Sequence, residues 1–138
     1  MTNTVDEMRA KILFDVIKEP CGMDTILLTE NLCRDFKIGD GSVVNALKNI
    51  NIEIEKGKLT ILRGRSGSGK TTLINILGAL DKPTKGKVMF GGRDITRLSE
   101  RARDDIRRYK MAFVFQSVAL MSGMTAYENV DFGLRLAK

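Results

Sequence analysis

The sequence has 138 residues, of which 43% are hydrophobic and 29% charged, which is typical of one ordinary globular domain. Lys and Arg outnumber Asp and Glu by 23 to 17, so the net charge is +6, which suits an anionic ligand or a nearby membrane surface. Most of this charge is expected on solvated surface, and a nucleic-acid partner is not expected. The densest basic stretch lacks interleaved aromatic residues and consists of Arg101, Arg103, Arg107, Arg108 and Lys110.

The two cysteines, Cys21 and Cys33, make neither a disulfide framework nor a metal-ligand spacing, so reduced thiols in the cytosol are expected. Asp6 and Glu7 precede a broken apolar stretch, which is unlike a secretory signal. No apolar run approaches the roughly 18 residues of a membrane span.

The N-terminal stretch from Thr4 to Glu19 has apolar residues near helical spacing. Thr4 and Glu7 form a capping-box pair, and Pro20 ends the pattern. We therefore predict an amphipathic helix within an N-terminal extension over residues 1–24. Its apolar stripe packs either on its own domain, which is favoured, or in the groove of a partner.

An antiparallel β layer is predicted next. Thr25–Leu32 and Val43–Leu47 resemble strands, and Lys37–Ser42 contains a Gly-Asp-Gly turn between them. From Ile50 to Glu55 apolar and polar residues alternate, which is typical of a half-buried strand.

Residues 64–72 read GRSGSGKTT and fit the phosphate-loop pattern. Leu59–Leu62 before them is predicted to be a buried strand, and the run from Thr72 to Leu77 is compatible with a helix. Backbone N–H groups of such a loop and of the following helix bind phosphate. Lys70 would reach the β- and γ-phosphates, and the Thr71 hydroxyl is a suitable Mg²⁺ ligand.

Shorter elements follow. We expect a turn over Asp81–Gly86, a strand over Lys87–Phe90, a helix capped by Ser99 and running through Tyr109, and a strand over Met111–Phe115. Thr125 and Glu128 form a second capping-box pair for a helix from Ala126 to the end.

Together these features resemble the ATP-binding subunit of ABC transporters. The similarity covers about residues 26–138 and includes ALKNINIEIEKGKLTILRGRSGSGKTTLINILGALDKPTKGKVMFGGRDI and FVFQ. GALDKPTKGKV and MTAYENV especially resemble the lipoprotein-release and macrolide-export type. The resemblance implies an α/β P-loop NTPase fold of ABC type with an N-terminal antiparallel β layer. Residues 25–138 would be the N-terminal part of the ATP-binding domain.

The resemblance also implies ATP and Mg²⁺ as cofactors. Phe36 would stack on adenine, although a core aromatic is the alternative. Lys70 and Gln116 would be catalytic, and Thr71 and Gln116 would contact Mg²⁺. The nucleotide-binding residues implied are Phe36, Gly64, Arg65, Ser66, Gly67, Ser68, Gly69, Lys70, Thr71 and Thr72. Arg65 is bulkier than the small residues often found at its position.

The second half of the family pattern is absent from the sequence. No LSGGQ-like run and no four apolar residues followed by Asp-Glu occur after Gln116, and the chain has no histidine. We therefore expect a form truncated before the second half of the core, without ATPase activity of its own. The expected partners are a membrane permease and a second ATP-binding subunit, which would place the chain on the cytoplasmic face of the membrane. The alternatives are a nucleotide-binding regulator that does not hydrolyse ATP and a different P-loop enzyme; a GTPase is disfavoured because no Asn-Lys-x-Asp run is present.

Overall fold

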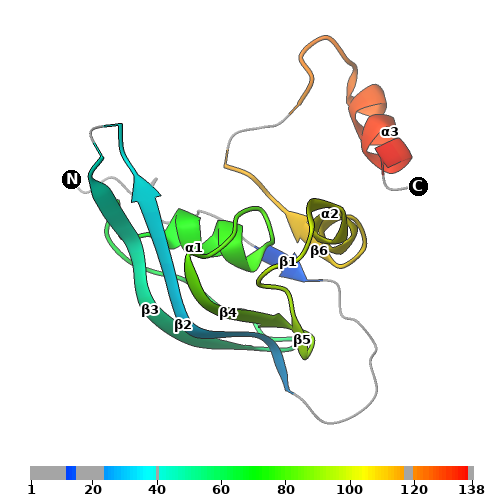
Figure 1. The fold of residues 1–138 in the computed structure, drawn as a ribbon. Coiled ribbons are helices and arrows are strands. Elements are labelled where there is room, and N and C mark those ends of the chain that lie inside the picture. Colours follow the sequence, from blue (N-terminus) through cyan, green and yellow to red (C-terminus); the bar gives the residue numbers. More distant parts are fainter. Residues whose placement is uncertain (1–11, 15–23, 40, 117–119, 137–138) are drawn as a thin grey trace, which may run out of the picture.

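The computed structural model describes residues 12–14, 24–39, 41–116 and 120–136. A four-stranded antiparallel sheet, in the order β3-β2-β4-β5, forms one layer, and helix α1 lies against it (Figure 1). A second, two-stranded sheet joins β1 to β6 beside helix α2. Helix α3 stands apart from these layers (Figure 1). The described chain thus has an antiparallel β layer followed by an α/β part, as predicted.

The large sheet is built on one long hairpin. Strand β2 spans Thr25–Lys37 and strand β3 spans Val43–Glu55, and both are longer than predicted. The two strands predicted in the second arm are one continuous strand, in which Asn49 has a φ of 50°. The β2–β3 register shifts near this point, so a bulge replaces the expected break.

The other side of β2 pairs with β4, which spans Lys85–Phe90. Strand β5 is a two-residue extension, Arg93–Asp94, after the predicted Gly91-Gly92 turn. Gly86 in β4 has a φ of 88°, and a Cβ there would lie 2.4 Å from the Asn31 carbonyl oxygen. Only glycine allows this close approach of β4 to β2.

Helices α2 and α3 begin where the sequence predicts, whereas α1 begins at Lys70, earlier than the run from Thr72 that was predicted. Helix α1 spans Lys70–Leu77, α2 spans Glu100–Tyr109 and α3 spans Ala126–Leu136. The Ser99 hydroxyl accepts the Ala102 N–H at the start of α2. At the start of α3, Glu128 Oε2 accepts the Thr125 N–H at 2.7 Å and Thr125 Oγ1 accepts the Glu128 N–H at 3.3 Å. The second capping box is therefore confirmed.

The hydrophobic core lies between the large sheet and helix α1, and it extends to α2 and β6. Its buried members are Ile26, Leu27, Leu32, Leu47, Ile54, Leu73, Ile76, Leu77, Val88, Phe90, Ile95, Ile106 and Met111. The alternation from Ile50 to Glu55 is confirmed, since Ile54 is buried while its neighbours Glu53 and Glu55 are exposed.

The predicted strand before the phosphate loop is wrong for this structure. Residues 58–65 form an irregular connection, and the Leu59, Ile61 and Leu62 side chains are 78%, 63% and 42% exposed. An apolar run becomes a buried strand only when neighbouring strands pair with its backbone. Among the described residues none pairs with this run, because β2, β3, β4 and β5 complete one sheet and β6 pairs with β1.

The helix predicted over residues 4–19 is also wrong where it can be compared. Ile12–Phe14 forms strand β1, which pairs antiparallel with β6, Met111–Phe113. Hydrogen bonding to a distant strand here overrides the helical spacing, a signal that carries no information on long-range partners. The rest of the predicted helix lies outside the described residues. Cys21 does too, whereas Cys33 is a half-buried free thiol.

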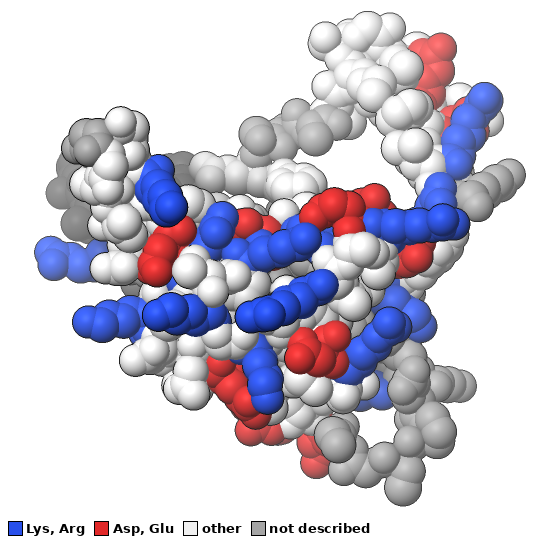
Figure 2. Space-filling model, viewed as in Figure 1, with Lys and Arg blue, Asp and Glu red and all other residues white. Residues whose placement is uncertain are grey.

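Helices of the described segments are too short or too polar to cross a membrane. Lys and Arg are prominent on the face shown in Figure 2, with carboxylates lying between them. One arginine of the basic stretch departs from the expected solvated surface: Arg103 is only 5% exposed.

Candidate functional site

The glycine-rich loop turns sharply before helix α1. Gly67 and Gly69 have φ values of 77° and 85°, a left-handed conformation that favours glycine. A Cβ at Gly69 would lie 2.4 Å from the Ala46 carbonyl oxygen and 2.9 Å from Leu47 Cδ2. Gly69 is therefore the point at which the loop packs directly on strand β3, and a side chain there would displace the loop.

The Lys70 ammonium lies across this loop. Its Nζ donates to the carbonyl oxygens of Gly64 at 2.7 Å and Arg65 at 2.6 Å, and to Ser68 Oγ at 3.3 Å. An ammonium has three donors, and three loop acceptors match them. These three hydrogen bonds therefore hold the loop around the positive charge of the lysine.

The start of α1 adds further donors to the same place. Its N-cap is Gly69, with no side-chain cap, and its first internal hydrogen bond runs from the Leu73 N–H to the Gly69 carbonyl at 2.8 Å. The N–H groups of the first turn have no partner within the helix, and no acidic residue lies in that turn. The helix dipole and Lys70 together make this a positive site suited to an anion.

The two threonines after the lysine lie on this first turn. Thr71 is exposed and Thr72 is half-buried, while Leu73, Ile74, Ile76 and Leu77 bury the opposite face of α1 in the core. The helix is thus anchored by its apolar face and presents its N-terminus outward. Gly64, Arg65, Ser66, Gly67 and Ser68 are all exposed.

Phe36 lies at the hairpin end of β2 and is 39% exposed. It pairs with Val44, and Arg34 two residues earlier pairs with Leu47, the residue against which Gly69 packs. The structure therefore brings Phe36 to the same end of the hairpin as the phosphate loop. The Phe36 side chain is therefore accessible to a ligand.

Gln116 is exposed on the segment that follows β6. This segment is fixed by Phe113, whose ring lies against α1 at Gly78, and Phe113 stacks on Phe115 with ring centroids 5.6 Å apart. In the described part of the chain no hydrogen bond joins Gln116 to the loop. The described residues also contain no group of three or more His, Cys, Asp or Glu side chains that could hold a metal ion.

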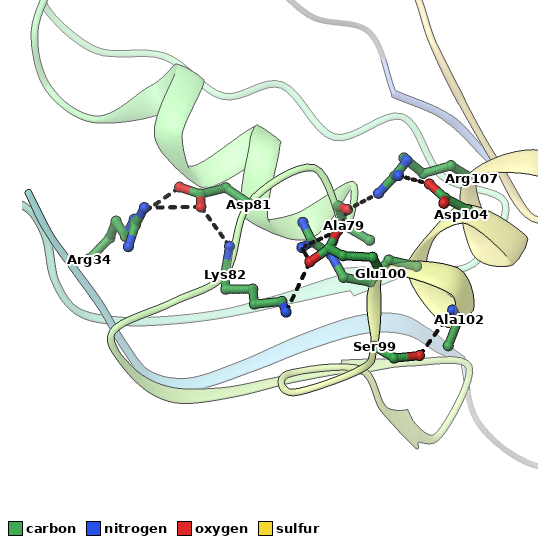
Figure 3. A network of polar contacts seen from close by, with 10 residues as sticks. Arg34, Ala79, Asp81, Lys82, Ser99, Glu100, Ala102, Asp104 and Arg107 are labelled. Atoms are coloured by element: carbon green, nitrogen blue, oxygen red, sulfur yellow. Dashed lines mark hydrogen bonds and ion pairs between the residues drawn. The ribbon is translucent and has the colours of Figure 1, made fainter.

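Sequence reasoning missed a polar network at the other end of α1 (Figure 3). Arg103 Nε donates to the Ala79 carbonyl at 3.0 Å, and Arg107 donates to the same oxygen. Arg103 and Lys82 both pair with Glu100, at 2.9 and 3.0 Å. The helical spacing of Arg103 and Arg107, four residues apart on one face, was the available signal. These contacts tie α2 to the C-terminal end of α1, where cations complement the helix dipole.

Comparisons with known proteins agree with this arrangement. The family model described as ABC transporter matches residues 47–138. The chain is 41% identical over 108 residues to the macrolide export ATP-binding/permease protein MacB of Vibrio parahaemolyticus, covering 78% of this chain and 16% of that protein. It is 39% identical over 115 residues to the Fe(3+) ions import ATP-binding protein of Photobacterium profundum, covering 83% of this chain and 30% of that protein.

Among solved structures, the dimeric form of the bacterial ABC transporter cassette MJ0796 superposes with a TM-score of 0.76 at 38% identity. The match covers 82% of this chain and 48% of that chain. The chain belongs to the ABC transporter family and carries the N-terminal part of an ATP-binding cassette. The chain spans less than half of the length of each relative named here. The family and the fold class predicted from the sequence are confirmed.

Proposed function

We propose that the chain provides the phosphate-binding part of an ABC transporter cassette, binding ATP with Mg²⁺ to drive substrate movement through a membrane partner. The observation that carries this proposal is the loop geometry: the Lys70 ammonium donates to three acceptors of the loop, directly at the uncapped N-terminus of α1. A helix N-terminus beside an ammonium favours the dense negative charge of a triphosphate. A solved relative holds ADP and inorganic phosphate, which supports a nucleotide of this class.

The roles follow from position and chemistry. Backbone N–H groups of residues 64–72, with the Ser66 and Ser68 hydroxyls, would hold the phosphates, and Lys70 would leave its loop carbonyls for them. The Thr71 hydroxyl, exposed on the first turn of α1, would bind Mg²⁺. Gln116 would contact Mg²⁺ and the attacking water, and Phe36 would stack on adenine.

The partners belong to the same proposal. A second cassette and a membrane permease would complete the assembly, which would hold this chain on the cytoplasmic face of the membrane. The dimeric state of the MJ0796 cassette supports the first partner, and the ATP-binding/permease name of the macrolide relative supports the second. The relatives include an importer and an exporter, so the proposal names no direction of transport.

The test of nucleotide binding is Lys70→Ala. Because a charge-assisted hydrogen bond contributes roughly 1.5–3 kcal/mol, we expect ATP affinity to fall by about ten- to a hundredfold. Isothermal titration of the parent and variant measures this, with Lys87→Ala as the control. Lys87 is an exposed lysine on β4 that pairs with Glu30 at 3.7 Å. Equal affinity of the parent and Lys70→Ala would refute the proposed role of the loop.

The 138-residue chain is expected to bind ATP without turning it over. Phosphoryl transfer needs a group that positions the attacking water and carboxylates that hold Mg²⁺. The Asp-Glu run that supplies them in the family has no counterpart after Gln116. ATPase assays should show no rate above that of Lys70→Ala. A rate of about 1 s⁻¹ or more, an ordinary enzyme turnover, would contradict this expectation. Binding without turnover also fits a nucleotide-dependent regulator, the alternative function.

A further inference from the structure

The ring proposed to stack on adenine is covered on one side by an arginine. The Arg34 guanidinium carbon lies 4.4 Å from the centroid of the Phe36 ring, within the roughly 6 Å range of a cation–π contact. Both residues belong to β2, and positions two apart on a strand share one face. The contact therefore follows from the strand itself.

The arginine is in turn held by a carboxylate. Arg34 Nε donates to Asp81 Oδ2 at 2.9 Å and a terminal nitrogen of Arg34 donates to Asp81 Oδ1 at 3.0 Å (Figure 3). This is a bidentate pair, which fixes the plane of the guanidinium as well as its position. Both side chains are partly buried, at 24% and 30% exposure, so the pair is less screened than a surface ion pair.

Asp81 is fixed to the end of the phosphate-binding helix. Its backbone N–H donates to the Asn75 carbonyl at 3.1 Å, and the Leu80 N–H donates to the same oxygen at 2.7 Å. Asp81 Oδ1 also accepts the Lys82 N–H at 2.7 Å. One continuous set of contacts thus joins Phe36, Arg34, Asp81 and the C-terminal end of α1, the helix whose first turn carries Lys70.

We propose that Arg34, held by Asp81, is a positioning residue that orients the Phe36 ring for the base of the nucleotide. This proposal rests on the proposed function, since it takes Phe36 as the adenine contact. The guanidinium covers one face of the ring and the electrostatic attraction restrains its tilt, which leaves the other face for the base. Because α1 connects Asp81 at one end to the phosphate loop at the other, the pair also fixes the position of the base contact relative to the loop.

The experiment separates base binding from phosphate binding. Isothermal titration of the full chain with ATP and with inorganic tripolyphosphate is compared for the parent, Arg34→Met and Phe36→Leu. Because an exposed to partly buried cation–π contact contributes roughly 0.5–1 kcal/mol, Arg34→Met should weaken ATP binding about two- to fivefold. Tripolyphosphate has no base, so its affinity should stay unchanged. In the Phe36→Leu background, Arg34→Met should cause no further loss.

Two variants complete the design. Arg93→Met on β5 removes the same charge from an exposed position and should leave both affinities unchanged. Asp81→Asn loosens the arginine without removing it and should weaken ATP binding only where Arg34 is present. If circular dichroism shows that Arg34→Met melts below the assay temperature, Asp81→Asn alone carries the test. It should then weaken ATP binding and leave the affinity for tripolyphosphate unchanged.

The failures are distinguishable. Unchanged ATP affinity in Arg34→Met and Asp81→Asn, or an equal loss for ATP and tripolyphosphate, would overturn the proposal. If Lys70→Ala weakens ATP binding but Phe36→Leu does not, the positioning proposal alone is overturned. If Lys70→Ala has no effect, the proposed function fails, and the inference fails with it.

Discussion

Many apolar side chains of the large antiparallel sheet are buried and its strands are paired, whereas several apolar segments around the sheet are exposed. In the sheet, Leu27 and Leu32 are fully buried, and β2 pairs along both of its edges. By contrast, residues 59–62, Val114 and Phe115 are exposed, and α3 has no buried residue. The difference shows that burial here follows strand pairing: β2 pairs with both β3 and β4, whereas no described strand pairs with residues 59–62.

The largest expected effect tests this difference directly. Leu27→Ala should destabilise the chain by about 2–5 kcal/mol, because it opens a cavity in a fully buried site. Leu59→Ala removes the same atoms from a side chain that is 78% exposed and should change stability by less than about 0.5 kcal/mol. Urea unfolding of the two variants measures both. Similar losses would mean that Leu59 is buried in solution and that the comparison fails.

A pair of glycines gives the next effect. Gly78 at the end of α1 faces the Phe113 ring, and a Cβ there would lie 1.7 Å from Phe113 Cζ. Gly78→Ala should therefore cost about 1–3 kcal/mol as β6 is pushed from α1.

Gly133 inside α3 is the matched control, since no atom lies within 4 Å of a Cβ built there. Gly133→Ala should be neutral or stabilise α3 by up to about 1 kcal/mol through helix propensity. Thermal melts of the two variants check this. A destabilising Gly133→Ala would show that α3 packs against other parts of the chain in solution.

The smallest effect concerns the cap of α3. The Thr125 N–H and hydroxyl, hydrogen-bonded to the Glu128 carboxylate, hold the pKa of that carboxyl below its ordinary value. A lowered pKa in the folded state means that the cap is fully present above the unfolded value, about 4.3, and is lost as the pH falls through the folded value. Titration of the Thr125 amide chemical shift should give a midpoint below 4.3.

Glu128→Gln is the control for the cap, because its amide oxygen still accepts the hydrogen bond but does not titrate in this range. The Thr125 amide shift of this variant should stay constant between pH 3 and 6. A midpoint for the parent at or above that of an unfolded glutamate would contradict the cap.

The sequence predicted the locally determined features and failed where pairing is long-range. The hairpin turn, the Ser99 cap and the Thr125–Glu128 capping box were predicted correctly because each depends on residues a few positions apart. Ile12–Phe14 was assigned wrongly because its partner strand, Met111–Phe113, lies far away in sequence. Leu59–Leu62 was assigned wrongly because an apolar run does not reveal whether any strand pairs with it. For the site, the phosphate-loop pattern located Lys70 and the start of α1. The Arg34–Asp81 pair joins residues 47 positions apart and has no local signature beyond the strand spacing of Arg34 and Phe36.

The pairing of β1 with β6 has a consequence for the order in which the chain acquires its structure. Ile12 pairs with Phe113, about a hundred residues later, whereas the β2–β3 hairpin closes over a few residues. During synthesis, β2, β3 and β4 can all pair before Met111–Phe113 has left the ribosome. Among the described strands, β1 is then the last to find its partner, because it must stay available until Met111–Phe113 has been made.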